Sequence, residues 1–157
     1  MNLSTLAARY AQTPHKVCIA IPLLIMGILY WLSSIPGVRL PASPEVYALF
    51  YWISPTLQNV LHVPAYAALG WTMCWALRAW LNRASAIVLI AAGISTICGI
   101  LDEWHQSFVP GRYASLTDLT LDVAGVALGI VLAVWTSRCA AQVNASRAIR
   151  VHQQRTR

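Results

Sequence analysis

The side chains able to carry acid–base chemistry are few in this sequence, and several recur at helical spacing. His62 and Tyr66 are four residues apart, as are Asp118 and Asp122, so each pair shares one face of a helix. Carboxylates and imidazoles that lie close together act as general acids and bases in enzymes. The carboxylates of the whole chain are Glu45, Asp102, Glu103, Asp118 and Asp122.

The composition indicates which elements must position these side chains. Hydrophobic residues make up 58% of the 157 residues and charged residues only 10%, against about 25% charged residues in a typical soluble domain. With a mean hydropathy of +0.59, this composition excludes a disordered chain and disfavours a soluble domain. Long apolar runs fit helices of about 20 residues that cross a bilayer. We therefore predict one all-α, polytopic membrane domain over 1–157, a bundle of four transmembrane helices at about residues 17–35, 56–78, 84–106 and 116–138.

The basic residues are distributed unevenly over the loops between these spans. With the N-terminus inside, only Arg39 and Arg112 of the 11 Lys and Arg residues fall outside. The positive-inside rule therefore predicts an N-in, C-in protein of the plasma (inner) membrane. The basic segment 139–157 is then a cytoplasmic tail that faces lipid headgroups. We expect membrane lipids as partners and no nucleic acid.

Under this topology the polar groups of all four spans lie at one depth, near the outer face. Ser34 ends the first span, His62 begins the second and Gln106 ends the third. The four carboxylates of the last two spans lie at this level, and with the one guanidinium of Arg112 they leave three negative charges. Such a cluster should not stay fully ionised, so we expect a bound cation, protonated carboxyls or a cationic partner. His105, at the water interface, is expected to be solvated.

The loop 107–115 precedes the last span and carries signals for a turn and a helix start. We expect it to turn at Pro110 and the glycine that follows. Ser115 is placed to cap the helix N-terminus, with Asp118 three residues later completing a capping box. An acid at Asp118 also suits the helix dipole. Asp122 lies one turn deeper, where the dipole does not explain it.

Small residues mark the faces of the last two spans that should meet other helices. Gly125 and Gly129 continue the acidic stripe of the last span, and Gly93 and Gly99 lie in the third span. Small residues let membrane helices approach closely, whereas a carboxylate in contact with lipid is costly. The acidic stripe is therefore predicted to face a neighbouring helix.

The order and spacing of these motifs resemble the VanZ-like family of membrane proteins from Ser33 to Gly129. The resemblance is carried by Ser33-Ser34-Ile35-Pro36, His62 with Tyr66 and Gly70, Glu103-x-x-Gln106, Pro110-Gly111-Arg112, Asp118, and Gly125 with Gly129. The family often has an Asp-Lys pair where this chain has Gln58 and Asn59, and Asn in place of Asp122. The resemblance implies a small multi-span membrane protein linked to antibiotic resistance. The antibiotic is teicoplanin, a glycopeptide that binds cell-wall precursors outside the membrane.

Two functional interpretations fit the outer polar layer, and the sequence leaves open whether the protein is an enzyme. In the first, a membrane enzyme acts on a cell-envelope or lipid-linked substrate, with Glu103 or Asp118 as general acid or base and His62 as a second proton carrier. Arg112 then binds an anionic group, and the substrate-binding set is Arg112, Gln106, Asp122, Tyr66 and Ser34. In the second, the same residues form the pocket of a non-catalytic accessory protein that binds a lipid-linked cell-wall precursor or a glycopeptide.

The remaining interpretations have less support in the sequence. An ion pathway lacks a continuation, because the inner halves of the spans carry no ionisable group apart from cysteines. A purely structural role would make Arg112 a clamp between helix ends. A divalent-metal site formed by Glu103, Asp118, Asp122 and His62 suits the residue types. No metal-spacing motif supports it, so we predict no metal and no cofactor.

Overall fold

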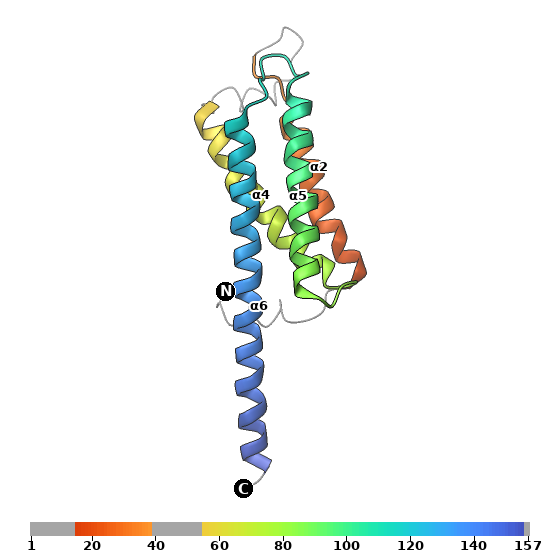
Figure 1. Cartoon of the computed structure of the whole chain (residues 1–157), viewed down its shortest axis with the longest axis vertical. Helices are drawn as coiled ribbons and strands as arrows, with labels where there is room; N and C mark the ends of the chain where they lie inside the picture. The colour runs from red at the N-terminus through yellow and green to blue at the C-terminus, as the bar shows by residue number, and fades with distance from the viewer. Residues whose placement is uncertain (1–14, 39–54, 156–157) are drawn as a thin grey trace.

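A computed structural model of the chain describes residues 15–38 and 55–155 and shows an all-helical bundle. Figure 1 shows the helices running along a common long axis, with the end of α6 extending past the others. No β-strand occurs in these two described ranges, which confirms the predicted all-α class. The elements are η1 (Lys16–Ile19), α2 (Ala20–Ser33), α4 (Pro55–Leu77), α5 (Ala84–Gln106) and α6 (Leu116–Arg155).

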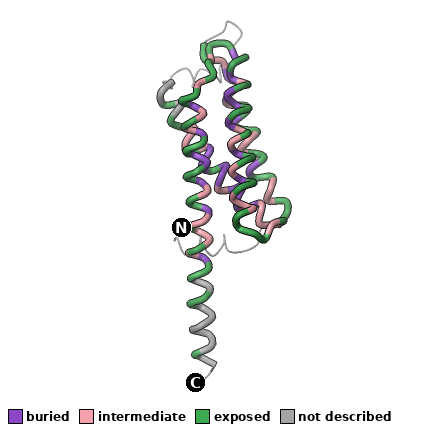
Figure 2. The backbone as a smooth tube through the Cα atoms, viewed as in Figure 1, coloured by how far each residue is buried: buried purple, intermediate pink, exposed green. Residues whose placement is uncertain are grey.

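Four of these helical segments are long and apolar enough to cross a membrane, as predicted. They are Lys16–Ser33, Val60–Leu77, Ala84–Gln106 and Leu116–Gln142. Large apolar side chains cover the outside of the bundle: Leu24, Leu89 and Val131 are 65%, 71% and 63% exposed. Figure 2 shows buried and exposed positions alternating along each helix, as expected for helices packed along one face. Lipid is the solvent that such a surface fits.

The closest helix pair is α4 and α6, and glycine makes the approach possible. A Cβ atom on Gly125 would lie 2.5 Å from the carbonyl oxygen of Val63, and one on Gly129 would collide with the carbonyl oxygen of Ala67. The small-residue stripe of α6 therefore faces a neighbouring helix, as predicted. The same expectation is wrong for Gly93, where a Cβ would meet no atom within 4 Å. Gly93 lies on the exposed face of α5.

The connector between α5 and α6 packs against the end of α2. The Gly37 N–H donates to the carbonyl of Pro110 over 3.0 Å, and Ile35 is only 1% exposed. The predicted turn is present, with Gly111 at φ +75°, a left-handed conformation that favours glycine. Hydrogen bonding between these two segments joins the first span to the loop that leads into the last one.

The last helix runs past the span boundary predicted near residue 138 into the basic segment. The structure continues α6 without interruption to Arg155, so the basic segment begins as an extension of the last span. The predicted span 84–106 matches α5. The other predicted boundaries differ from the helix ends by at most three residues. The N-in, C-in orientation stays a prediction from the charge distribution.

Candidate functional site

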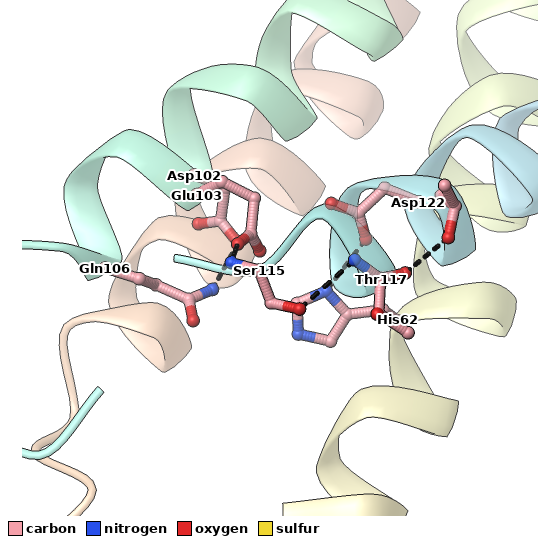
Figure 3. Close-up of polar contacts among 8 residues, drawn as sticks. His62, Asp102, Glu103, Gln106, Ser115, Thr117 and Asp122 are labelled. Atoms are coloured by element: carbon pink, nitrogen blue, oxygen red, sulfur yellow. Dashed lines mark hydrogen bonds and ion pairs between the residues drawn. The ribbon is translucent and has the colours of Figure 1, made fainter. Parts of the chain in front are cut away.

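The centre of the polar end of the bundle is an ion pair between α4 and α6. The His62 Nδ1 atom lies 2.8 Å from the Asp122 Oδ1 atom, with side chains 17% and 1% exposed. Figure 3 shows the two side chains meeting between their helices. The ring of Tyr66, one turn along α4, stacks toward His62 at a centroid distance of 6.0 Å. Gly99 on α5 makes room, since a Cβ there would lie 3.1 Å from Asp122 Oδ2.

Helix α5 adds two buried carboxylates beside this pair. Asp102 and Glu103 are both 6% exposed. The Gln106 amide donates to Asp102 Oδ2 over 3.0 Å, and the Ser115 backbone N–H donates to Glu103 Oε2 over 2.7 Å. Figure 3 shows both contacts. His62, Asp102 and Glu103 each offer one ligand-type atom, and these three atoms lie within 4.8 Å of one another.

The start of α6 corrects the predicted capping box. Ser115 does cap the helix, because its Oγ accepts from the Thr117 backbone N–H over 3.1 Å. The reciprocal bond expected from Asp118 is made instead by Glu103 of α5, which accepts the Ser115 N–H. The longer Glu side chain is the usual partner in this motif, and here it comes from a neighbouring helix.

Asp118 is consequently not used by the cap. Its side chain is 7% exposed, and its Oδ1 atom is buried without a hydrogen bond in the described part of the chain. The nearby charges of His62 and Arg112 are its electrostatic partners. We call His62, Asp102, Glu103, Asp118 and Asp122 the carboxylate–histidine cluster.

Arg112 supplies positive charge beside this cluster and is fixed to the end of the first span. Its Nε donates to the carbonyl of Ile35 over 3.2 Å. Burial lowers the pKa of Arg112, while the negative charges of Asp102, Asp118 and Glu103 oppose that shift. A guanidinium stays protonated in proteins, so Arg112 offsets one of the four negative charges.

A second polar contact lies nearby, and it corrects one expectation. The Ser34 Oγ lies 3.0 Å from His105 Nε2 and donates to the Tyr30 carbonyl over 2.7 Å. Since the hydroxyl proton is used there, Nε2 of His105 is the donor. His105 is half-buried and its ring lies 4.5 Å from that of Tyr30, so the expectation of a merely solvated side chain is wrong. Ser34, predicted in the substrate site, makes its described hydrogen bonds with His105 and Tyr30, and its substrate-binding role stays a prediction.

An apolar groove of about 630 Å³ runs between α2 and α5 and ends at the cluster. Met26, Ile94 and Ile97 line its apolar part, and Asp102 and His105 line it further along α5. Asp102 therefore belongs both to the groove and to the three-residue constellation with His62 and Glu103. The groove joins an apolar surface to buried polar atoms.

Most residues predicted for the site lie in or beside the cluster, and the sequence-based set omitted Asp102 and His105. Their signals are the four-residue spacing of Asp102 from Gln106, and the position of His105 on the same turn of helix. Glu45 lies outside the described residues, and so do the side chains of Gln58 and Asn59.

The four apolar helices define a multi-pass membrane protein, and the buried carboxylates and imidazole give it a polar site at one end. A family model described as VanZ/LLP1 matches residues 16–137, and the chain belongs to this family. The resemblance seen in the motifs is thereby confirmed, and the matched segment contains the whole cluster. No curated protein and no solved structure matches the chain.

Proposed function

We propose that this protein is a membrane enzyme that performs acid–base chemistry on a lipid-linked molecule of the cell envelope, at the outer face of the plasma membrane. One observation carries the proposal: the apolar groove between α2 and α5 ends on Asp102, whose carboxylate neighbours His62 and Glu103. An acyl or prenyl chain fits the apolar lining of the groove. A polar headgroup on that chain then lies against the cluster.

The cluster has the groups that proton transfer needs. Asp122 Oδ1 is hydrogen-bonded to His62 Nδ1. The other ring nitrogen of His62, Nε2, is then the one that can exchange a proton with a substrate. Glu103 Oε1 is buried and has no hydrogen-bond partner in the described part of the chain. A carboxylate oxygen in that state is placed to accept or deliver a proton. Glu103 or Asp118 then acts as general acid or base, and His62 carries the second proton.

The binding groups around the cluster indicate the class of headgroup. Arg112 is held by the Ile35 carbonyl through Nε, so its two terminal nitrogens remain to bind an anionic oxygen pair. Gln106, Asp122 and Tyr66 complete the proposed binding set. The family's association with teicoplanin resistance supports a cell-wall precursor as the substrate, because such precursors combine a lipid chain with a polar, anionic headgroup.

The experiment is mass spectrometry of envelope lipids and wall precursors from cells that express the protein. Asp118→Asn is the informative variant, because it removes one acid of the cluster, and the buried Oδ1 atom of Asp118 has no hydrogen bond in the described part of the chain. The control is Thr136→Ala, at the opposite half of α6, where the hydroxyl bonds only to carbonyls of its own helix. Protein levels in the membrane are matched for all three.

We expect a covalent change in one lipid class with the wild type and the control, and its loss with Asp118→Asn. No covalent change with the wild type would overturn the enzyme proposal. A lipid or precursor that co-purifies unmodified would then favour the alternative, a non-catalytic protein that binds an envelope molecule.

A further inference from the structure

We propose that His62, Asp102 and Glu103 bind a first-row divalent cation, with Zn²⁺ and Mn²⁺ as the fitting ions. The proposal concerns the same site as the proposed function and does not require that the site be catalytic. With the ion bound, His62 and Glu103 are ligands, and Asp118 is the group that remains as general acid or base. One ligand-type atom from each residue lies within 4.8 Å of the others. Bonds of about 2.0–2.2 Å place the ligands of a tetrahedral ion about 3.3–3.6 Å apart. The set must therefore close by up to about 1.5 Å around an ion, which rotation of the side chains can supply.

One side-chain atom of each of the three residues is held by a hydrogen bond, and we assign the other atom as the ligand. Asp122 holds Nδ1 of His62, Gln106 holds Oδ2 of Asp102, and the Ser115 backbone N–H holds Oε2 of Glu103. This leaves Nε2, Oδ1 and Oε1 as the ligand atoms. Metal-binding histidines typically have a carboxylate on the second ring nitrogen, and ligating carboxylates are likewise hydrogen-bonded. The cluster has this outer shell complete.

A buried and unpartnered atom gives independent support. Glu103 is 6% exposed, and its Oε1 atom has no hydrogen-bond partner in the described part of the chain. Buried carboxylate oxygens without a partner are costly. A cation is the partner that this oxygen and the carboxylates around it favour most. Asp118 and Asp122 each have one more buried oxygen without a partner, Oδ1 and Oδ2 respectively.

The ligand types select the kind of ion. One imidazole nitrogen with two carboxylate oxygens suits Zn²⁺, Mn²⁺ or Fe²⁺, whereas Ca²⁺ and Mg²⁺ prefer oxygen ligands alone. Three protein ligands leave at least one coordination position open. Because Asp102 also lines the groove, an anionic headgroup lying there can reach that position. A divalent cation thus lowers the net charge of the cluster with Arg112 from three negative charges to one, and so weakens its repulsion of an anionic lipid.

The absence of a metal-spacing motif has a simple cause. His62 comes from α4, and the two carboxylates come from α5, 40 and 41 residues later in the numbering. Adjacent Asp102 and Glu103 also differ from the separated ligands of common zinc motifs. Only the packing of the two helices brings the set together.

The test measures metal on the purified full-length protein in detergent micelles, after removal of metal with a chelator. Mn²⁺ binding is followed by electron paramagnetic resonance, and Zn²⁺ content by mass spectrometry of the element after dialysis. We expect one equivalent of ion per chain. Asp102→Asn and Glu103→Gln should each weaken binding at least about tenfold, and Asp122→Asn, which acts through His62, about 10–100-fold.

The control is His105→Gln, a histidine on the same helix that contacts Ser34 and is not part of the set; it should bind as the wild type does. Gln at position 103 keeps an oxygen for the Ser115 N–H, and if that variant fails to fold, Asp102→Asn decides alone. Failure of the wild type to bind either ion, or binding by both ligand variants as tight as that of the wild type, overturns the site. A metal-loaded protein that changes no lipid contradicts only the proposed function, whereas a wild type that changes a lipid but binds neither ion contradicts only the metal site.

Discussion

At one end of the bundle the charged side chains are buried, and at the other end they lie at the surface. The buried charged residues of 15–38 and 55–155 form the acidic end: Asp102, Glu103, Asp118 and Asp122. The basic end carries Arg78, Arg83 and Arg138, of which the last two are exposed. A groove of about 480 Å³ at the basic end is lined by two of these arginines, but none of the three is buried.

The length of the charged side chains explains why only the acidic end needs hydrogen-bond partners inside the bundle. An arginine reaches the headgroup region with its guanidinium while its stem covers apolar surface. The short side chains of Asp118 and Asp122 stay at the depth of their backbone, one of them pressed against α5 at Gly99. Buried carboxylates within a membrane span are costly and are usually kept for function. The comparison therefore directs functional experiments to the acidic end.

The largest expected effect is at the ion pair of the acidic end. His62→Ala removes the hydrogen-bond partner of Asp122 Oδ1, and Oδ2 already has none in the described part of the chain. Breaking a buried pair typically costs about 3–5 kcal/mol. We expect a clear drop in the midpoint of thermal unfolding in detergent. The double variant His62→Ala, Asp122→Ala should recover most of the loss, and a single variant as stable as the wild type would contradict the pairing.

A smaller effect is expected where α4 and α6 approach each other below the cluster. Gly125→Ala places a Cβ atom 2.5 Å from the Val63 carbonyl oxygen, which is backbone and cannot turn away. Overpacking of this kind costs about 1–3 kcal/mol. Gly93→Ala is the matched control, since no atom lies within 4 Å of its Cβ. Equal unfolding midpoints for the two variants would show that the helices are not in contact at Gly125.

The cap of α6 should contribute less than the ion pair. Ser115→Ala removes the Oγ that accepts from Thr117 but keeps the backbone N–H that Glu103 accepts. The loss of an N-cap costs about 1 kcal/mol. Chemical unfolding should show a modest decrease with no change in metal binding. A tenfold loss of Mn²⁺ affinity would instead mean that the hydroxyl itself serves the cluster.

The smallest effect belongs to the basic end. Arg138→Gln replaces an exposed residue on α6, and such surface changes usually stay within about 0.5 kcal/mol. We expect an unfolding midpoint equal to that of the wild type. A destabilisation as large as that of His62→Ala would remove the contrast between the two ends.

Much of the acidic end follows from the sequence, but its pairings do not. Periodicity and topology place His62, Gln106 and the acids of the last two spans at one depth. They do not show that Ser115 serves Glu103 rather than Asp118, or that Ser34 binds His105, because these partners are 12 and 71 residues apart. Such pairings depend on how each helix is rotated about its own axis. The contact of Gly125 with Val63 is one of those that set the rotation.

The sequence by itself determined the four apolar helices, the turn at Gly111 and the cap at Ser115, because hydropathy, left-handed backbone and capping are properties of short segments. It also determined that the last span would turn its glycines and acids inward. Only the tertiary structure decided that Asp122 pairs with His62, and that Asp102 joins an apolar groove to this pair. Those contacts arise where three helices meet, and the geometry of that meeting is fixed by packing between segments far apart in the chain.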